Sequence, residues 1–122
     1  MRGVELPTGI ESIPAQSRSY WAFQYQLGRQ VIVPALRRRG AFQPGYTVAE
    51  IGSGEGGVLM AFIAEGATAA LGTDIDSPRL MLGRQIATAL NWPVTFVEHN
   101  ILTDSIPEAW HGRYDLVLLR DT

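Results

Sequence analysis

Three glycines separated by single residues form the part of the sequence best suited to bind a ligand. Gly52, Gly54 and Gly56 follow a short apolar run that ends at Ile51, and a second apolar segment begins at Val58. Glycine allows the backbone to turn sharply and allows a ligand to approach the main chain closely. A helix that begins after this turn points its free amides toward a negatively charged group. The stretch therefore predicts the cofactor-binding turn of a nucleotide-type α/β domain.

Two acidic residues accompany the turn and narrow the choice of ligand. Asp74 follows the first glycine by about 20 residues, and a glycine turn with such an acid is the pattern of NAD-binding domains. Glu50 precedes the first glycine by two residues, where its carboxylate would repel a pyrophosphate and attract a cation. Asn100, which can accept a hydrogen bond, is expected at the same edge of the fold as Asp74. These residues favour a cationic nucleotide-type ligand, and NAD is the alternative.

Alternating strands and helices are expected to position these residues. Strands are predicted at residues 47–51, 68–73, 94–97 and 114–119, and helices at 57–65 and 77–90. Pro78 is favoured in the first turn of the second helix, and Asp76 or Ser77 can cap it. Residues 98–113 are predicted to form a loop with one helical turn around residues 107–110. This alternation predicts an α/β fold with a parallel sheet.

One long helix is expected before the first strand. Residues 1–16 are predicted to be an irregular lead-in. From about Ser17, apolar side chains recur at helical spacing. Tyr20, Trp21 and Tyr25 are expected to pack in the core, and covering the ligand site as a lid is their alternative role. Pro34 should kink or restart this helix, because proline lacks the amide hydrogen of the helical ladder.

Four motifs, in their order along the chain, resemble those of the class I S-adenosylmethionine-dependent methyltransferases. The first has two apolar residues, an acid, an apolar residue and then G-x-G-x-G, and lies in Val48–Gly56. The others look like the motifs of the family's second, third and fourth strands and lie in Leu71–Pro78, Phe96–Ile101 and Tyr114–Val117. Residues Tyr20–Tyr25 also resemble the leading helix of members that act on small molecules.

This resemblance implies a fold and an activity. The fold would be a Rossmann-like parallel sheet of order 3-2-1-4 with crossover helices, truncated after the fourth strand. Residues 1–45 would form the lead-in and helix, and residues 46–122 the first half of a domain that binds S-adenosylmethionine. All three helices would cover one face of the sheet, and residues 101–113 would cover the other. The implied activity is methyl transfer from this cofactor to a small-molecule acceptor.

The resemblance implies an adenosine-binding role for four residues. Asp74 would accept hydrogen bonds from both ribose hydroxyls, and Ile75 would lie against the adenine ring. Asn100, followed by Ile101, stands where the family usually has an aspartate that binds the adenine amino group. Three of the four have a purely structural alternative, because Asp74 could cap a helix, Ile75 could be core, and Asn100 could form an Asx-turn.

The remaining cofactor contacts are expected at the glycine turn itself. Gly52, Ser53 and Gly54 would allow close backbone approach to the methionine part of the cofactor. Glu50 would lie near the amino end of that part or would hold the amides of the turn. Glu55 is expected to be a solvated acid in the first turn of the following helix.

Composition excludes several classes of function. The net charge of −2 gives no electrostatic case for binding nucleic acid or an anionic membrane. The chain has no cysteine, which removes disulfides and cysteine-type zinc sites. No apolar run approaches the roughly 20 residues of a membrane span, and no signal peptide is recognisable, so a cytoplasmic location is predicted.

The sequence assigns neither a catalytic residue nor a metal ligand. His99 and His111 are the only histidines, and a lone histidine in a loop is expected to be a surface residue rather than a catalyst. The residues after the fourth strand, Arg120, Asp121 and Thr122, give no recognisable acceptor motif.

The fourth strand suggests a partner. Leu116, Val117, Leu118 and Leu119 form a continuous apolar run, which is typical of a strand buried on both faces. The sequence ends three residues later, so an edge strand would expose apolar surface and unpaired backbone. A C-terminal half or a second copy of the chain is therefore predicted to cover this strand. A non-catalytic fragment or interaction module is the third functional alternative.

Overall fold

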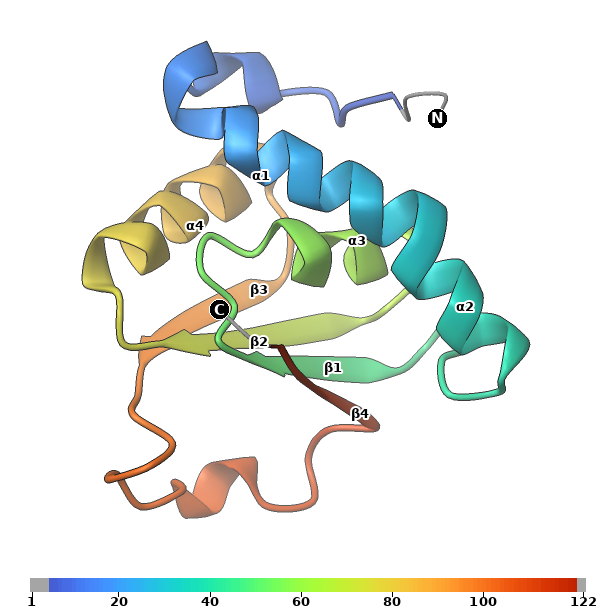
Figure 1. Ribbon diagram of the computed structural model, residues 1–122, viewed down its shortest axis with the longest axis vertical. Helices are drawn as coiled ribbons and strands as arrows, with labels where there is room; N and C mark the ends of the chain where they lie inside the picture. Colours follow the sequence, from blue (N-terminus) through green and yellow to red (C-terminus); the bar gives the residue numbers. More distant parts are fainter. Residues whose placement is uncertain (1–4, 121–122) are drawn as a thin grey trace.

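A four-stranded parallel sheet organises the protein, whose computed structural model describes residues 5–120 (Figure 1). The strands are β1 (Thr47–Ile51), β2 (Ala69–Asp74), β3 (Val94–Glu98) and β4 (Leu116–Leu119). Their order in the sheet is β3-β2-β1-β4, and every neighbouring pair is parallel. The predicted order and fold class are confirmed. The first four residues of the predicted lead-in, together with Asp121 and Thr122, lie outside the described residues.

Helices cover only one face of this sheet. Helices α1 (Ala15–Leu27), α3 (Gly57–Ala64) and α4 (Ser77–Leu90) lie together on that face, and the segment between β3 and β4 lies on the other (Figure 1). That segment contains a single 3-10 turn, Glu108–Trp110, as predicted. Helix α3 is apolar and almost fully buried, because α1 packs over it and the sheet lies beneath it.

The leading helix continues through the predicted interruption. A π-helical turn, Gly28–Ile32, follows α1, and α2 (Val33–Arg38) follows at once. Pro34 lies in the first turn of α2, where its missing amide hydrogen is tolerated. Gly28 packs tightly on α3, because a Cβ atom placed there would lie 2.5 Å from the Cβ of Ala61. The predicted restart of the helix at Pro34 is therefore confirmed, and a π-helical turn precedes it.

One hydrophobic core joins these helices to the sheet. Trp21 and Tyr25 are fully buried, with stacked rings 4.9 Å apart, which confirms their predicted place in the core. Tyr20 is 52% exposed, so the core position predicted for it is wrong. Phe42 and Phe62 meet edge to face at 4.9 Å in the same core. The boundary predicted at residue 45 falls in the turn between α2 and β1.

Strand β4 is half covered. Within the part of the chain that the structure describes, it pairs only with β1, and Leu116 and Leu118 pack against the core. Val117 and Leu119 face the other way and are 55% and 76% exposed. The expected exposed apolar edge is thus present. None of the helices in residues 5–120 has the length and apolar character needed to cross a membrane.

Candidate cofactor site

The glycine turn is fixed to the end of the neighbouring strand. The backbone amides of Gly52 and Ser53 both donate to the carbonyl oxygen of Thr73, at 2.8 and 2.9 Å. Gly52, Gly54 and Gly56 have φ angles of 79°, 56° and 83°, in the left-handed region that other residues rarely adopt. The three glycines are therefore needed for the shape of the turn.

Asp74 links the turn to the start of α4. Its carboxylate accepts hydrogen bonds from the amides of Gly54, at 2.8 Å, and Asp76, at 3.0 Å. Asp76, rather than Asp74, caps α4 by accepting from the amide of Arg79 at 3.1 Å. A carboxylate oxygen can accept more than one hydrogen bond, so Asp74 keeps the capacity to bind a hydroxyl.

A cavity of about 250 Å³ opens beside Asp74, at the carboxyl ends of the strands. Five predicted site residues line it: Gly52, Asp74, Ile75, Asn100 and Ile101. Ile75 is 67% exposed, so its alternative role as a core residue is wrong. We name this space the acid-lined cavity. Its exposed apolar side chains next to a fixed carboxylate suit a flat ring joined to a sugar.

The amide side chain of Asn100 is partly engaged. Its Oδ1 accepts a hydrogen bond from the amide of Leu102 at 2.9 Å, which confirms the predicted Asx-turn. The backbone amide of Asn100 donates to Asp104 at 2.9 Å. These bonds hold the loop at the mouth of the acid-lined cavity.

A second cavity, of about 130 Å³, lies on the other side of Gly52. We name it the arginine-lined cavity; it is bounded by Tyr20, Gln24, Gly52, Ser53, Glu55, Arg79 and Arg120. Glu55 is buried and forms an ion pair with Arg79 at 2.6 Å, so the prediction of a solvated acid is wrong. The guanidinium of Arg79 also lies over the ring of Tyr20, 5.7 Å from its centre.

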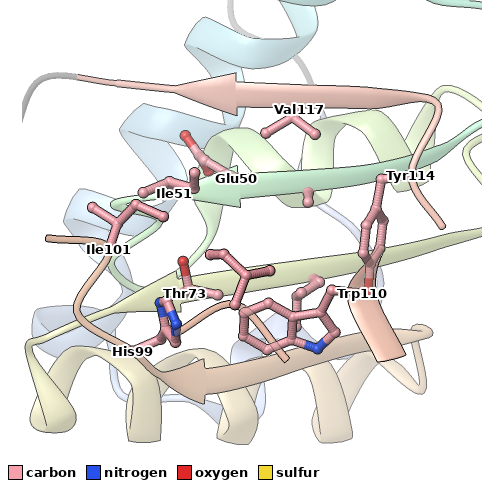
Figure 2. A pocket seen from close by; sticks show the side chains of 11 residues that line it. Glu50, Ile51, Thr73, His99, Ile101, Trp110, Tyr114 and Val117 are labelled. Atoms are coloured by element: carbon pink, nitrogen blue, oxygen red, sulfur yellow. The ribbon is translucent and has the colours of Figure 1, made fainter. Parts of the chain in front are cut away.

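Glu50, on β1, is buried and reaches this second cavity only through Arg120; it lines a further cavity on the face of the sheet that lacks helices (Figure 2). Its Oε2 pairs with Arg120 at 3.2 Å, and its Oε1 is buried with no hydrogen-bond partner among residues 5–120. Burial raises the pKa of Glu50 to about 7, although Arg120 opposes the increase. None of the turn amides described above donates to Glu50; they bond Thr73 and Asp74.

Arg79 and Arg120 are site residues that sequence reasoning missed. Each follows a strand closely, because α4 begins just after β2 and Arg120 is the first residue after β4. The carboxyl ends of parallel strands are where ligands bind in open α/β sheets, and this rule was the available signal. Arg120 also donates to the Oε1 of Gln24, on α1, at 2.8 Å.

A third cavity, of about 200 Å³, lies on the face of the sheet that lacks helices (Figure 2). His99 is buried there beside Trp110, with ring centres 5.1 Å apart, and its Nε2 lies 3.1 Å from the carbonyl oxygen of Ser105. The predicted surface position is therefore wrong for His99 and confirmed for His111, which is exposed. Among residues 5–120, no three metal-binding side chains gather in one place.

Comparisons with known proteins bear on the fold. No family model matches the sequence, and no curated protein does. A structure described as an S-adenosyl-L-methionine-dependent methyltransferase from Methanococcus maripaludis is 17% identical, with a TM-score of 0.66 over 98% of this chain and 53% of its own. A TehB-like S-adenosylmethionine-dependent methyltransferase from Corynebacterium glutamicum is 21% identical, with a TM-score of 0.58 over 88% of this chain and 56% of its own.

A third solved structure is coclaurine N-methyltransferase bound to N-methylheliamine and S-adenosylhomocysteine. It is 16% identical, with a TM-score of 0.59 over 72% of this chain and 25% of its own. The chain spans between about a quarter and just over half of the length of these three proteins. It has the Rossmann-like fold of S-adenosylmethionine-dependent methyltransferases, over that part of their length.

Proposed function

We propose that this chain binds S-adenosylmethionine and is the cofactor-binding part of a methyltransferase. The observation that carries the proposal is the acid-lined cavity, which brings Asp74, Ile75 and Asn100 together at the carboxyl ends of the strands. Ligands of open α/β sheets bind at that edge. The fold shared with solved methyltransferases supports the same ligand.

The side chains present fit the parts of this cofactor. The carboxylate of Asp74 is held in place by two backbone amides and can accept from the ribose hydroxyls. Ile75 and Ile101 offer exposed apolar surface to the adenine ring. The arginine-lined cavity, which Glu55, Arg79 and Arg120 line beside Ser53, contains both charge signs that an amino-acid group requires.

The chain's own part in the proposed reaction is to bind the cofactor and to orient it. When bound, S-adenosylmethionine supplies an activated methyl group on a sulfonium. The residues around the turn then contribute alignment and exclusion of water. We assign no general base: His99 lines the acid-lined cavity as well as the third cavity, but its ring packs against Trp110 and its Nε2 lies 3.1 Å from the carbonyl oxygen of Ser105.

NAD is the second candidate, and one observation favours it. Arg79 and Arg120 both line the cavity beside the turn, and guanidinium groups are well suited to bind phosphate. Arg120 also offsets the charge of Glu50, which weakens the charge argument against a pyrophosphate. Both arginines are already paired with carboxylates, however, so we place NAD second.

We propose a small molecule as the methyl acceptor. Tyr20 lies exposed beside the arginine-lined cavity, in the segment that resembles the leading helix of small-molecule enzymes. The neighbours include a coclaurine N-methyltransferase and a ribosomal protein L11 methylase, so the fold is compatible with different acceptors. A cytoplasmic location stays a prediction.

Titration calorimetry with S-adenosylmethionine, S-adenosylhomocysteine and NAD tests the proposal. We expect the first two to bind the unsubstituted chain, and Asp74→Ala to weaken both by tenfold or more. Glu108→Ala is the matched control, since it removes one acid from the exposed 3-10 turn. Binding of NAD alone would falsify the proposal. Binding of no ligand would support the non-catalytic interaction module instead.

A further inference from the structure

The two cavities beside the glycine turn share two lining residues. Gly52 and Arg120 line both the acid-lined and the arginine-lined cavity, and no other residue is common to the two. A ligand that fills both cavities must therefore pass between Gly52 and Arg120. If S-adenosylmethionine is that ligand, as proposed above, its sulfur is the atom that joins the adenosyl and amino-acid parts, and it lies near this junction.

Arg120 is held firmly at the junction. Its Nη1 donates to Glu50 on β1 at 3.2 Å, and its Nη2 donates to Gln24 on α1 at 2.8 Å. The Glu50 side chain is fully buried, whereas the Arg120 side chain keeps 29% of its surface exposed. The guanidinium is therefore anchored at its inner side and presented to the cavities on its outer side.

The other charged side chains near this junction are largely engaged in ion pairs or hydrogen bonds. Arg79 pairs with Glu55, and the carboxylate of Asp74 is bound by two backbone amides. Glu50 lines neither cavity and is reached at the junction only through its ion pair with Arg120. Arg120 is thus the residue whose charge most directly opposes a positive sulfur.

We infer that Arg120 sets the balance between the sulfonium cofactor and its neutral thioether product at this site. The inference rests on the proposed function. S-adenosylmethionine and S-adenosylhomocysteine share the adenosyl and amino-acid parts and differ by one methyl group and one positive charge at sulfur. A fixed guanidinium near that sulfur weakens binding of the sulfonium and leaves binding of the thioether almost unchanged. For any two unit charges about 6 Å apart, with screening between that of a protein surface and water, the Coulomb energy corresponds to about a tenfold change in affinity, which sets the order of magnitude expected.

The test is the ratio of two dissociation constants, Kd for S-adenosylmethionine over Kd for S-adenosylhomocysteine. Both are measured by calorimetry at pH 8 on the same preparation, so changes in folded fraction cancel. We expect Arg120→Gln to lower the ratio about tenfold. Arg120→Lys retains the charge and should leave the ratio unchanged. Arg39→Gln is the matched control, because Arg39 is exposed at the end of α2.

A second variant keeps the inference testable if Arg120→Gln does not fold. Glu50→Gln removes the neutralising acid and should raise the ratio about tenfold, in the opposite direction. An Arg120→Gln ratio equal to that of Arg39→Gln overturns the inference while the proposed function stands. Equal weakening of both ligands by Arg120→Gln also overturns it, because Arg120 would then bind the shared carboxylate. Absence of binding of either ligand to the unsubstituted chain overturns both proposals.

Discussion

Asp74 accepts a hydrogen bond from the backbone amide of Gly54 at 2.8 Å, although the two residues are 20 positions apart in the sequence. The same carboxylate lines the acid-lined cavity. One residue therefore shapes the turn and faces the ligand site. Loss of Asp74 must be measured through both effects, on folding and on binding.

A comparison of Asp74→Asn with Asp74→Ala should separate the effect of this residue on folding from its effect on binding. The asparagine oxygen can keep one of the two amide hydrogen bonds, whereas its NH2 group faces a backbone donor. We expect Asp74→Asn to lower the free energy of unfolding by about 1–3 kcal/mol, the cost of an unsatisfied buried donor. Denaturant unfolding gives this value. Affinity for S-adenosylhomocysteine should fall as well, and an unchanged affinity in both variants would remove Asp74 from the site.

Glu50 should make stability fall as pH rises. Its pKa is about 7 in the folded protein and 4.5 as an ordinary carboxyl, because burial and Asp74 raise it more than Arg120 and Arg79 lower it. The folded state therefore binds more protons than the unfolded state between these values. Glu50's contribution to the free energy of unfolding is fully present below pH 4.5 and is lost as pH rises through about 7.

The variant Glu50→Gln lacks this proton and should show the difference directly. Its free energy of unfolding, relative to that of the unsubstituted protein, should increase between pH 4.5 and 7 by up to about 3 kcal/mol. Urea unfolding at a series of pH values measures it, and Glu108→Gln serves as the exposed control. A relative stability that does not vary with pH would show that Glu50 is charged throughout.

Gly54→Ala should disturb the arginine-lined cavity through Arg79. A Cβ atom at Gly54 would lie 2.2 Å from the Nη2 of Arg79, so the guanidinium must leave its place beside Glu55. The left-handed backbone adds about 1–2 kcal/mol of strain. Gly40→Ala is the control, since its φ is 74° and nothing lies within 4 Å. We expect Gly54→Ala to be the less stable of the two in thermal unfolding, and Arg79→Ala to remove most of the difference between them.

The exposed side of β4 should drive self-association of this chain. Val117→Lys and Leu119→Lys place a charge on the open apolar edge, and because both side chains are exposed, stability should change by only about 0.5 kcal/mol. Sedimentation velocity over a range of concentrations should show association for the unsubstituted chain and a monomer for the variants. Phe23→Lys alters an exposed apolar residue on α1 and should leave association unchanged. A chain that is monomeric without substitution contradicts this prediction.

Local patterns in the sequence predicted the frame of the site. Strand–helix alternation and the glycine turn gave the parallel sheet, and the predicted bounds of its strands lie within two residues of those observed. Asp74 was identifiable because its distance from the turn is set by one helix and one strand. These features depend on contacts within or between successive elements, which periodicity and turn chemistry record.

Long-range pairs of charges were not predictable in the same way. Arg120 and Glu50 are 70 positions apart, and Arg79 and Glu55 are 24 apart. No local pattern specifies which arginine meets which acid, so Glu55 was expected to be solvated. His99 was misplaced for a similar reason, because its burial depends on Trp110, which returns from a loop with little regular structure.

The leading helix contains a π-helical turn at Gly28–Ile32. Over the same length along its axis, this turn holds one residue more than a regular α-helix would. Each residue of a helix rotates the chain by about 100°. If the same residues wound as a regular α-helix, everything before the turn would rotate relative to α2. Gln24 and Tyr20 would then point away from the glycine turn, and Trp21 would leave the core. The wider turn thus sets the rotation of α1, which reaches the site, relative to α2, which leads into β1.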